Sequence, residues 1–333
     1  MYRTTTIVGL FMYSITALYA QDSLKIGFSL GDFSADRWSQ EPQYFNAAAK
    51  ELGAKVLFEY AYGDAAKQLE QTTKLITSGI KVLVICPTNA EGWESVVEAA
   101  HKAGVKVIAY DRMLKNAAVD YYVSFFNEDI GRQQAKYAVE HRPKGNYVLL
   151  EGPTSDINSL FVLKGQKEVL KPYTDRGDIK ILLEKHPETW NSIDAYNEIQ
   201  SFLDKNKVRV DVILAANDDL ASGSIMALNM SLGTYDILIT GQDASVGGCQ
   251  NILDGKQSMT TYGSIRNLAA EAAAAAVKLA KGEKITSVNS SISNGKKEIP
   301  AILLKTVTVD KNNMKQTVIK DGYLKADQLY FAQ

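Results

Sequence analysis

VKVIAYDRML, residues 105–114, is the stretch from which the fold prediction starts. An apolar, β-branched run ends at Tyr110, and two opposite charges, Asp111 and Arg112, follow side by side. Gly104, just before the run, is typical of the C-cap of a preceding helix. In doubly wound parallel sheets, ligands bind beyond the carboxyl ends of buried strands. This stretch therefore predicts one strand of such a sheet, with ligand-binding chemistry at its end.

The same alternation of short apolar runs and helix-length segments continues along the chain. Because parallel strands need long crossovers, it predicts an α/β fold with two doubly wound parallel-sheet lobes covered by helices. Predicted strands are residues 25–30, 54–60, 82–86, 105–110 and 121–125 in a first series, and 146–152, 179–184, 210–217, 235–241 and 258–263 in a second, with short strands in 299–310. Predicted helices include residues 43–52, 65–78, 90–103 and 268–282.

Length and composition favour a soluble two-domain protein with a neutral ligand. The 333 residues exceed the usual size of one domain. Lys and Arg number 37 against 38 Asp and Glu, so nucleic acid and anionic membranes are poor partner hypotheses. Cys86 and Cys249 lie far apart, and neither they nor the three histidines show metal-site spacing. We predict no disulfide, no metal and no cofactor.

The N-terminus has the outline of a secretory signal peptide, residues 1–20. Arg3 precedes an apolar stretch, 7–18, and the small residue Ala20. Cleavage after Ala20 is expected, although Leu18 stands where a small residue is usual, and an uncleaved anchor is the alternative. The mature protein is then periplasmic.

Polar residues follow several predicted strands and have the chemistry that binds a polyol. Taken singly, each of them is explained better as a helix N-cap, above all Asp218. Together, carboxylates accept from hydroxyl protons, arginine donates through a rigid fork and amides do both. The set comprises Asp111, Arg112, Asn127, Asp156, Asn158, Asn217, Asp218 and Asp243.

Two tryptophans are placed to stack on the apolar face of a sugar ring. Trp38 follows the first strand beside Arg37, and Trp190 follows the strand at 179–184. Core packing explains either one as well. Trp93 lies in a helical pattern, where packing is favoured.

The sequence lacks several motifs that are typical of enzymes. The chain has no G-x-S-x-G elbow, Walker A loop, H-E-x-x-H, or G-x-G-x-x-G after the first strand. Paired carboxylates suffice for glycoside hydrolysis, but the neighbouring Arg and Asn are expected to hold one of them ionised with a low pKa instead of raising its pKa for acid catalysis. We therefore predict binding without turnover; a sugar-modifying enzyme is the alternative from another class.

The order and spacing of several motifs resemble the periplasmic sugar-binding proteins of the ribose-binding fold family, most closely members that bind D-xylose. The resemblance covers residues 24–333. The motifs are DRW (36–38), KVIAYDRML (106–114), YYVSFFNEDIGRQQA (121–135), LKPYTDRGDIK (170–180), AANDDLASG (215–223), ITGQDAS (239–245) and KNNMKQTVIKDGY (311–323).

The resemblance implies a type I periplasmic binding protein whose two lobes close over one monosaccharide. The implied N-terminal lobe is 24–124 plus 264–304, and the C-terminal lobe is 125–263 plus 305–333. The chain is expected to cross between them near 124–127, 262–264 and 304–306. The implied ligand contacts are Arg37, Trp38, Asp111 and Arg112 from the first lobe, and Asp156, Asn158, Trp190, Asn217 and Asp243 from the second.

Two departures from the family pattern leave the choice of sugar open. Gly263 stands where the D-xylose binders carry a lysine, and Phe126 replaces an acid near the first crossing. Another pentose or a hexose is therefore an alternative ligand. A monomer is expected to deliver the sugar to the permease of an ABC importer, or to signal to a membrane sensor kinase. A DNA-binding repressor is excluded because a secretion signal replaces the helix-turn-helix.

Overall fold

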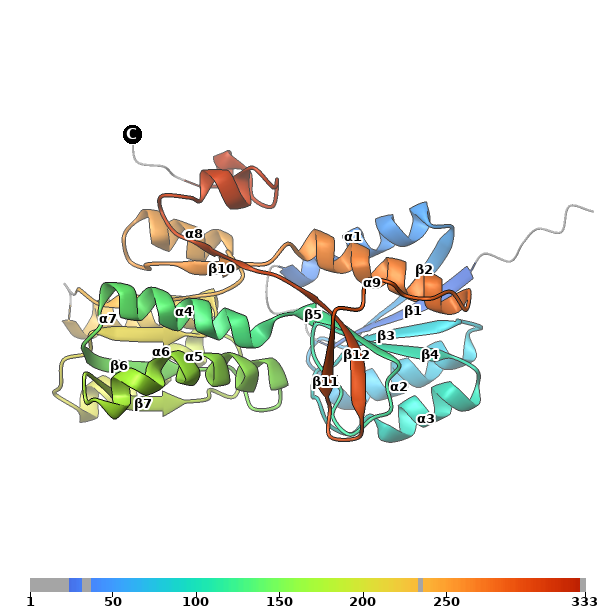
Figure 1. Cartoon of the computed structure of the whole chain (residues 1–333), viewed down its shortest axis with the longest axis horizontal. Helices are drawn as coiled ribbons and strands as arrows, with labels where there is room; N and C mark the ends of the chain where they lie inside the picture. Colours follow the sequence, from blue (N-terminus) through green and yellow to red (C-terminus); the bar gives the residue numbers. More distant parts are fainter. Residues whose placement is uncertain (1–23, 32–36, 233–235, 330–333) are drawn as a thin grey trace, which may run out of the picture.

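A computed structural model describes residues 24–31, 37–232 and 236–329. The predicted signal peptide, 1–20, lies outside these residues. Among the described helices, none is both long and apolar enough to cross a membrane. Two bodies, which we name lobe 1 and lobe 2, lie side by side along the long axis of the molecule (Figure 1).

Lobe 1 is built on a seven-stranded sheet in the order β11-β12-β5-β4-β3-β1-β2. All neighbours pair in parallel except β11 and β12. The strands are β1 (Leu24–Leu30), β2 (Ala54–Tyr60), β3 (Val82–Cys86), β4 (Lys106–Tyr110), β5 (Tyr121–Phe125), β11 (Ser290–Ser293) and β12 (Glu298–Leu304). The helices are α1 (Arg37–Glu51), α2 (Ala65–Thr77), α3 (Glu94–Lys102) and α9 (Ile265–Ala280).

Helices cover both faces of this sheet, which explains its continuous apolar strands. Along β3, Val82 and Val84 pack into the core that includes residues of α1 and α9. Leu83 and Ile85 point the other way, into the core under α2 and α3. Because side chains alternate between the two faces of a strand, both sets of positions must be apolar.

Lobe 2 contains a four-stranded parallel sheet, in the order β7-β6-β8-β9, and a two-stranded antiparallel sheet of β10 and β13. The strands are β6 (Gly145–Leu150), β7 (Ile179–Lys185), β8 (Val212–Ala215), β9 (Leu238–Ile239), β10 (Thr260–Tyr262) and β13 (Val307–Val309). The helices are α4 (Asn127–His141), α5 (Ile157–Asp175), α6 (Ser192–Lys205), α7 (Asp218–Leu232) and α8 (Val246–Leu253), followed by a π-helical turn, Lys315–Ile319, and a 3-10 turn, Ala326–Gln328.

The chain passes between the lobes after β5, after β10 and after β12 (Figure 1). These passages fall at 126, at 263–264 and at 305–306. The carboxyl ends of the two parallel sheets consequently face one another across the gap between the lobes. The division of the chain into two independently moving lobes at these points stays a prediction.

Three predicted helices begin elsewhere than expected, and the one predicted from 268, which begins at Ile265, differs least. The helix predicted from 43 begins at Arg37 and keeps Pro42 inside it, so that Arg37 and Trp38 occupy its first turn. The helix predicted from 90 begins at Glu94, because Gly92 adopts φ +89° and Trp93 is the N-cap. In each case the predicted start of the helix was wrong, whereas the presence of the helix was predicted correctly.

Candidate functional site

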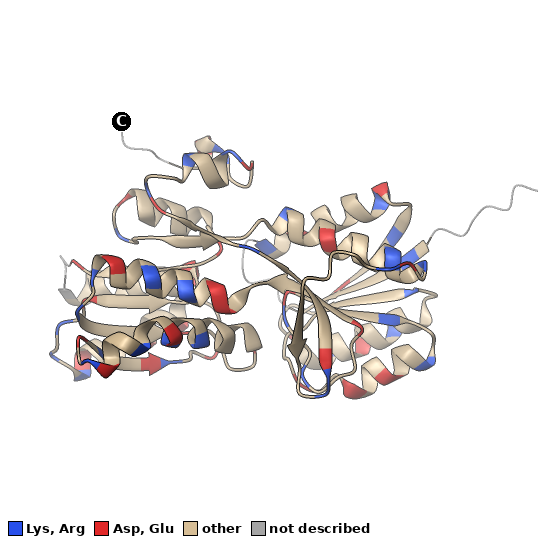
Figure 2. Ribbon diagram, viewed as in Figure 1, with Lys and Arg blue, Asp and Glu red and all other residues tan. Residues whose placement is uncertain are grey.

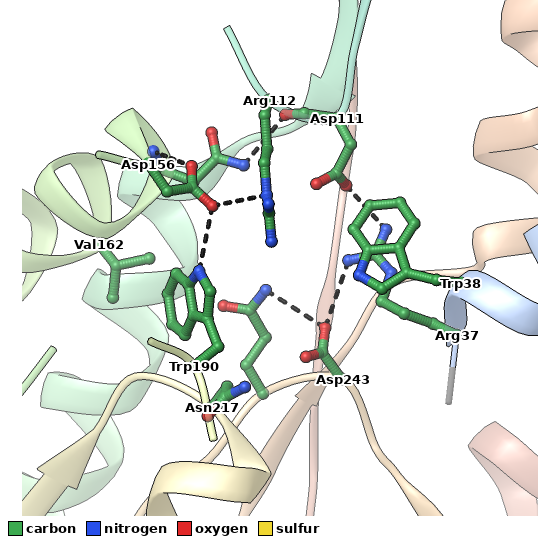
Figure 3. A pocket seen from close by; sticks show the side chains of 11 residues that line it. Arg37, Trp38, Asp111, Arg112, Asp156, Val162, Trp190, Asn217 and Asp243 are labelled. Carbon is green, nitrogen blue, oxygen red and sulfur yellow. Dashed lines mark hydrogen bonds and ion pairs between the residues drawn. The ribbon is translucent and has the colours of Figure 1, made fainter. Parts of the chain in front are cut away.

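A cavity of about 40 Å³ lies between the lobes, where the carboxyl ends of both sheets meet. Its wall combines charged, amide and indole side chains from both lobes (Figure 3). The lining residues are Arg37, Trp38, Asp111, Arg112, Asp156, Asn158, Val162, Trp190, Asn217, Gln242 and Asp243.

All nine residues predicted as ligand contacts therefore lie on one cavity; their contact with a ligand stays a proposal. Sequence reasoning missed Val162 and Gln242. Val162 lies one helical turn after Asn158 on α5, so the i, i+4 spacing was the available signal. Gln242 directly precedes Asp243 and donates to its Oδ1 at 3.4 Å.

Two strand-end residues considered in the sequence lie off the cavity. Asp218 is buried behind it, where it accepts from the Ser245 backbone N–H at 2.8 Å and from Gln257 Nε2 at 2.8 Å. Asn127 opens α4 and donates to Asn158 Oδ1 at 3.0 Å. Trp93 is also remote, a buried N-cap whose indole donates to the Asn89 carbonyl.

Arg37 forms three ion pairs at the site. Its Nε donates to Glu41 Oε1 at 2.6 Å, its Nη2 to Asp111 Oδ2 at 2.7 Å and its Nη1 to Asp243 Oδ1 at 3.4 Å. The guanidinium also lies 4.6 Å from the centroid of the Trp38 ring. Since Glu41 and Asp111 belong to lobe 1, this arginine is fixed within its own lobe.

Arg112 forms an ion pair with the opposite lobe. Its Nε lies 2.8 Å from Asp156 Oδ2, and that carboxylate also accepts from the indole Nε1 of Trp190 at 3.2 Å. Asp156 caps α5 by accepting from the Asn158 backbone N–H. Gly152 makes room for Trp190, because a Cβ there would lie 2.2 Å from the indole ring.

Direct contacts between the lobes show that the molecule is closed. Besides Arg112–Asp156 and Arg37–Asp243, the Asn158 amide donates to the Asp111 carbonyl at 3.0 Å. A backbone bond from Ala90 N–H to the Ser155 carbonyl, 3.0 Å long, joins two loops beside the cavity.

Burial raises the pKa values of the acids that lobe 2 brings to the cavity. The pKa of Asp156 is raised mainly by burial, against the lowering effect of Arg112. That of Asp243 is raised by burial as well, against Arg37. At Asp156 and Asp243, desolvation therefore outweighs the ion pair with arginine, so neither is a carboxyl held at a low pKa.

Two further acids lie buried behind the cavity, one in each lobe. Burial raises the pKa of Glu41 to about 7, although Arg37 and a hydrogen bond from Tyr110 act in the opposite direction. Burial likewise raises the pKa of Asp218 to about 7. Glu41 was not singled out in the sequence, and Asp218 was considered only as a strand-end residue or helix N-cap. Neither raised pKa was predicted, because a lone Glu or Asp in a helix carries no signal of its burial.

The two departures from the family pattern take different places in the structure. Gly263 lies against Phe125, and a Cβ at position 263 would sit 2.5 Å from the Phe125 ring. Phe125 therefore occupies the space that any side chain at 263 needs. Phe126 lies off the cavity, in a groove on the hinge side between α4, α5 and the β11–β12 hairpin.

Comparison with known proteins gives consistent matches over most of the chain. The family model described as periplasmic binding protein domain matches residues 26–284. The D-xylose-binding periplasmic protein of Haemophilus influenzae is 40% identical over 98% of this chain and 97% of its own length. The protein of the same name from Escherichia coli is 39% identical over 92% of each chain.

A solved structure agrees with the fold. The carbohydrate transporter solute binding protein of Chloroflexus aurantiacus, in complex with D-glucose, superposes with a TM-score of 0.86 at 32% identity, covering 92% of this chain and 98% of that one.

Proposed function

This chain belongs to the periplasmic binding protein domain family, and from that premise we propose that it captures one monosaccharide between its closing lobes for an ABC-type importer. The observation that carries the proposal is the shared cavity: charged, amide and indole side chains from both lobes converge on one buried gap. D-xylose is the first candidate ligand, by similarity to the relatives named for it.

The chemistry of the cavity wall suits a polyol. Asp111, Asp156 and Asp243 supply acceptors for hydroxyl protons, and the arginines supply forked donors to ring and hydroxyl oxygens. Asn158 and Asn217 offer both. The indoles of Trp38 and Trp190 lie on opposite sides of the cavity in Figure 3, where apolar ring faces of a sugar would be placed.

Capture requires the lobes to part and close again. The cavity of about 40 Å³ holds only a few water molecules, so the side chains that line it must move apart to admit a pyranose. The sugar hydroxyls then bond to charged and amide side chains of both lobes. The sugar favours the closed state because only there does it contact both lobes.

The proposal involves no chemical step. The family supports a solute-binding role, and each cavity carboxylate of lobe 2 is held in an ion pair. Incubating the protein with candidate sugars and analysing the mixture for products tests this directly. Any product formed in proportion to protein would contradict it.

A panel of monosaccharides tests ligand and function together. D-xylose, L-arabinose, D-ribose, D-glucose and D-galactose are compared by thermal shift. A sugar at 100 times its Kd adds about 2.7 kcal/mol of stability. We expect the largest shift with D-xylose; a larger shift with a hexose would reassign the ligand, and no shift with any sugar would overturn the function.

Whether the sugar-bound protein serves transport or signalling needs a separate test. We propose that the closed protein acts as a periplasmic monomer that delivers its sugar to a membrane permease. Sugar-dependent stimulation of the reconstituted transporter would support delivery. Stimulation of a sensor kinase instead, with no effect on transport, would assign the protein to signalling.

A further inference from the structure

The backbone carbonyl of Asp111 accepts three side-chain hydrogen bonds. Two come from β5 in the same lobe, from Tyr122 Oη at 2.8 Å and Ser124 Oγ at 2.7 Å. The third comes from Asn158 Nδ2 of lobe 2 at 3.0 Å. A carbonyl oxygen has two lone pairs, so three donors exceed the number of hydrogen bonds that it usually accepts.

Asp111 needs this support because its backbone is strained. It adopts φ +59°, a left-handed conformation that is unfavourable for a residue other than glycine. Its N–H donates to the Val123 carbonyl at 2.8 Å. Both polar groups of Asp111's backbone are thus bonded to β5, and these bonds offset the cost of the left-handed turn.

The turn determines where two adjacent charged side chains go. The Asp111 carboxylate meets Arg37 within lobe 1, whereas the guanidinium of Arg112 meets Asp156 of lobe 2. Without the turn, the strand would continue extended and send successive side chains to opposite faces.

We propose that Tyr122 and Ser124 are positioning residues for ligand binding, which hold the left-handed turn at Asp111 so that Asp111 and Arg112 both face the ligand. Neither residue lines the cavity, and both are fully buried. They stand two positions apart on β5, on one face of the strand. The Asn158 amide completes the set of donors when lobe 2 closes. This role rests on the proposed function.

Tyr122→Phe and Ser124→Ala each remove one donor with little change of shape. The affinity for the sugar that stabilises the wild type is measured by calorimetric titration. Each variant is expected to bind ~3- to 10-fold more weakly, as befits the loss of one hydrogen bond. Ser124→Thr keeps the hydroxyl and should bind more tightly than Ser124→Ala.

Matched controls separate positioning from general stability. Tyr147 is a buried tyrosine of β6 whose hydroxyl donates to the Arg142 carbonyl at 2.6 Å, and Ser224 is a buried serine of α7 that donates to the Leu220 carbonyl at 2.8 Å. Tyr147→Phe and Ser224→Ala should lower the melting temperature and leave affinity within twofold. Equal affinities for the β5 variants and these controls would overturn the proposal.

A ligand-independent measurement keeps this test separate from the proposed function. The crystal structure of the Tyr122→Phe/Ser124→Ala double variant is expected to show Asp111 relaxed out of the left-handed region. Retention of φ near +59° with unmoved Asp111 and Arg112 side chains would contradict the positioning role, whether or not the wild type binds a sugar.

Discussion

Lobe 1 and lobe 2 contribute chemically different halves of the cavity. From lobe 1 come two arginines, one aspartate and Trp38; from lobe 2 come two aspartates, three amides, Val162 and Trp190. The first half-site carries an excess of positive charge, and the second an excess of negative charge. Closure therefore brings opposite charges together in a site that excludes water, where their interaction is stronger than in solvent.

On the face shown in Figure 2, basic and acidic residues are interspersed over the helices and loops of both lobes. The formal net charge of the chain is −1. Within the cavity, by contrast, the charged residues are divided unevenly between the lobes.

Removing the arginine that reaches across the gap should have the largest effect. Arg112→Ala leaves Asp156 buried without its guanidinium, and truncating one partner of a buried charge pair costs about 2–5 kcal/mol of binding. Calorimetric titration should show at least a ~30-fold loss of affinity. Arg176→Ala, at an exposed pair with Asp178, is the control. Unchanged affinity of Arg112→Ala would refute the site.

The acids behind the two half-sites should make stability depend on pH. The pKa of Glu41 is raised in the folded state from 4.5 to about 7, so the folded protein binds this proton more tightly than the unfolded chain. Its contribution to stability is complete below about pH 4.5 and declines as pH rises to about 7. Asp218 acts in the same direction in lobe 2.

Glu41→Gln isolates this contribution. The variant is neutral at every pH and keeps an acceptor for Arg37, so its stability relative to wild type should rise by on the order of 2 kcal/mol between pH 5 and pH 8. Urea unfolding at each pH provides the measurement. Glu70→Gln, from an exposed i, i+4 pair with Lys74, should leave the profile unchanged. If the stability of Glu41→Gln changed with pH in parallel with that of the wild type, Glu41 would not titrate in this range.

Double-mutant cycles should rank the two ion pairs that join the lobes. Arg112 and Asp156 approach to 2.8 Å with both side chains under 10% exposed, whereas Arg37 and Asp243 are 3.4 Å apart and Asp243 is 21% exposed. The coupling energy in sugar binding should be larger for the first pair by about 1 kcal/mol. The reverse order would mean that Arg37, despite its bonds within lobe 1, makes the dominant contact between the lobes.

The sequence predicted the strand ends well because parallel sheets bring them to one edge. An apolar run followed by a polar residue was enough to locate four of the residues that line the cavity: Asp111, Asp156, Asn217 and Asp243. The start of α1 was missed because Pro42 argues for a boundary, whereas the structure keeps this proline inside the helix, in its second turn. Glu41 and Asp218 were missed as titrating groups, since burial sets their pKa values and depends on residues distant in sequence.

The left-handed conformation of Asp111 also depends on residues distant in sequence. An aspartate after a strand is compatible with several turns, and only the donors on β5 select this one. Local sequence therefore located the charged groups, while contacts from other strands determined their orientation and protonation.

The smallest effect expected concerns the two indoles, which serve their half-sites differently. Trp190 donates its N–H to Asp156, whereas the Trp38 ring faces the guanidinium groups of Arg37 and Arg112 at 4.6 and 5.6 Å. Trp190→Phe keeps an aromatic face and loses one hydrogen bond to a carboxylate, so affinity should fall by about 1 kcal/mol.

Trp93→Phe provides the control for losing an indole N–H bond away from the cavity, since Trp93 donates to the Asn89 carbonyl. It should lower stability and leave affinity unchanged. If Trp190→Phe bound sugar as tightly as wild type, the indole would act through its ring alone. The two tryptophans would then serve both half-sites in the same way, and the difference between the lobes would be confined to their charged groups.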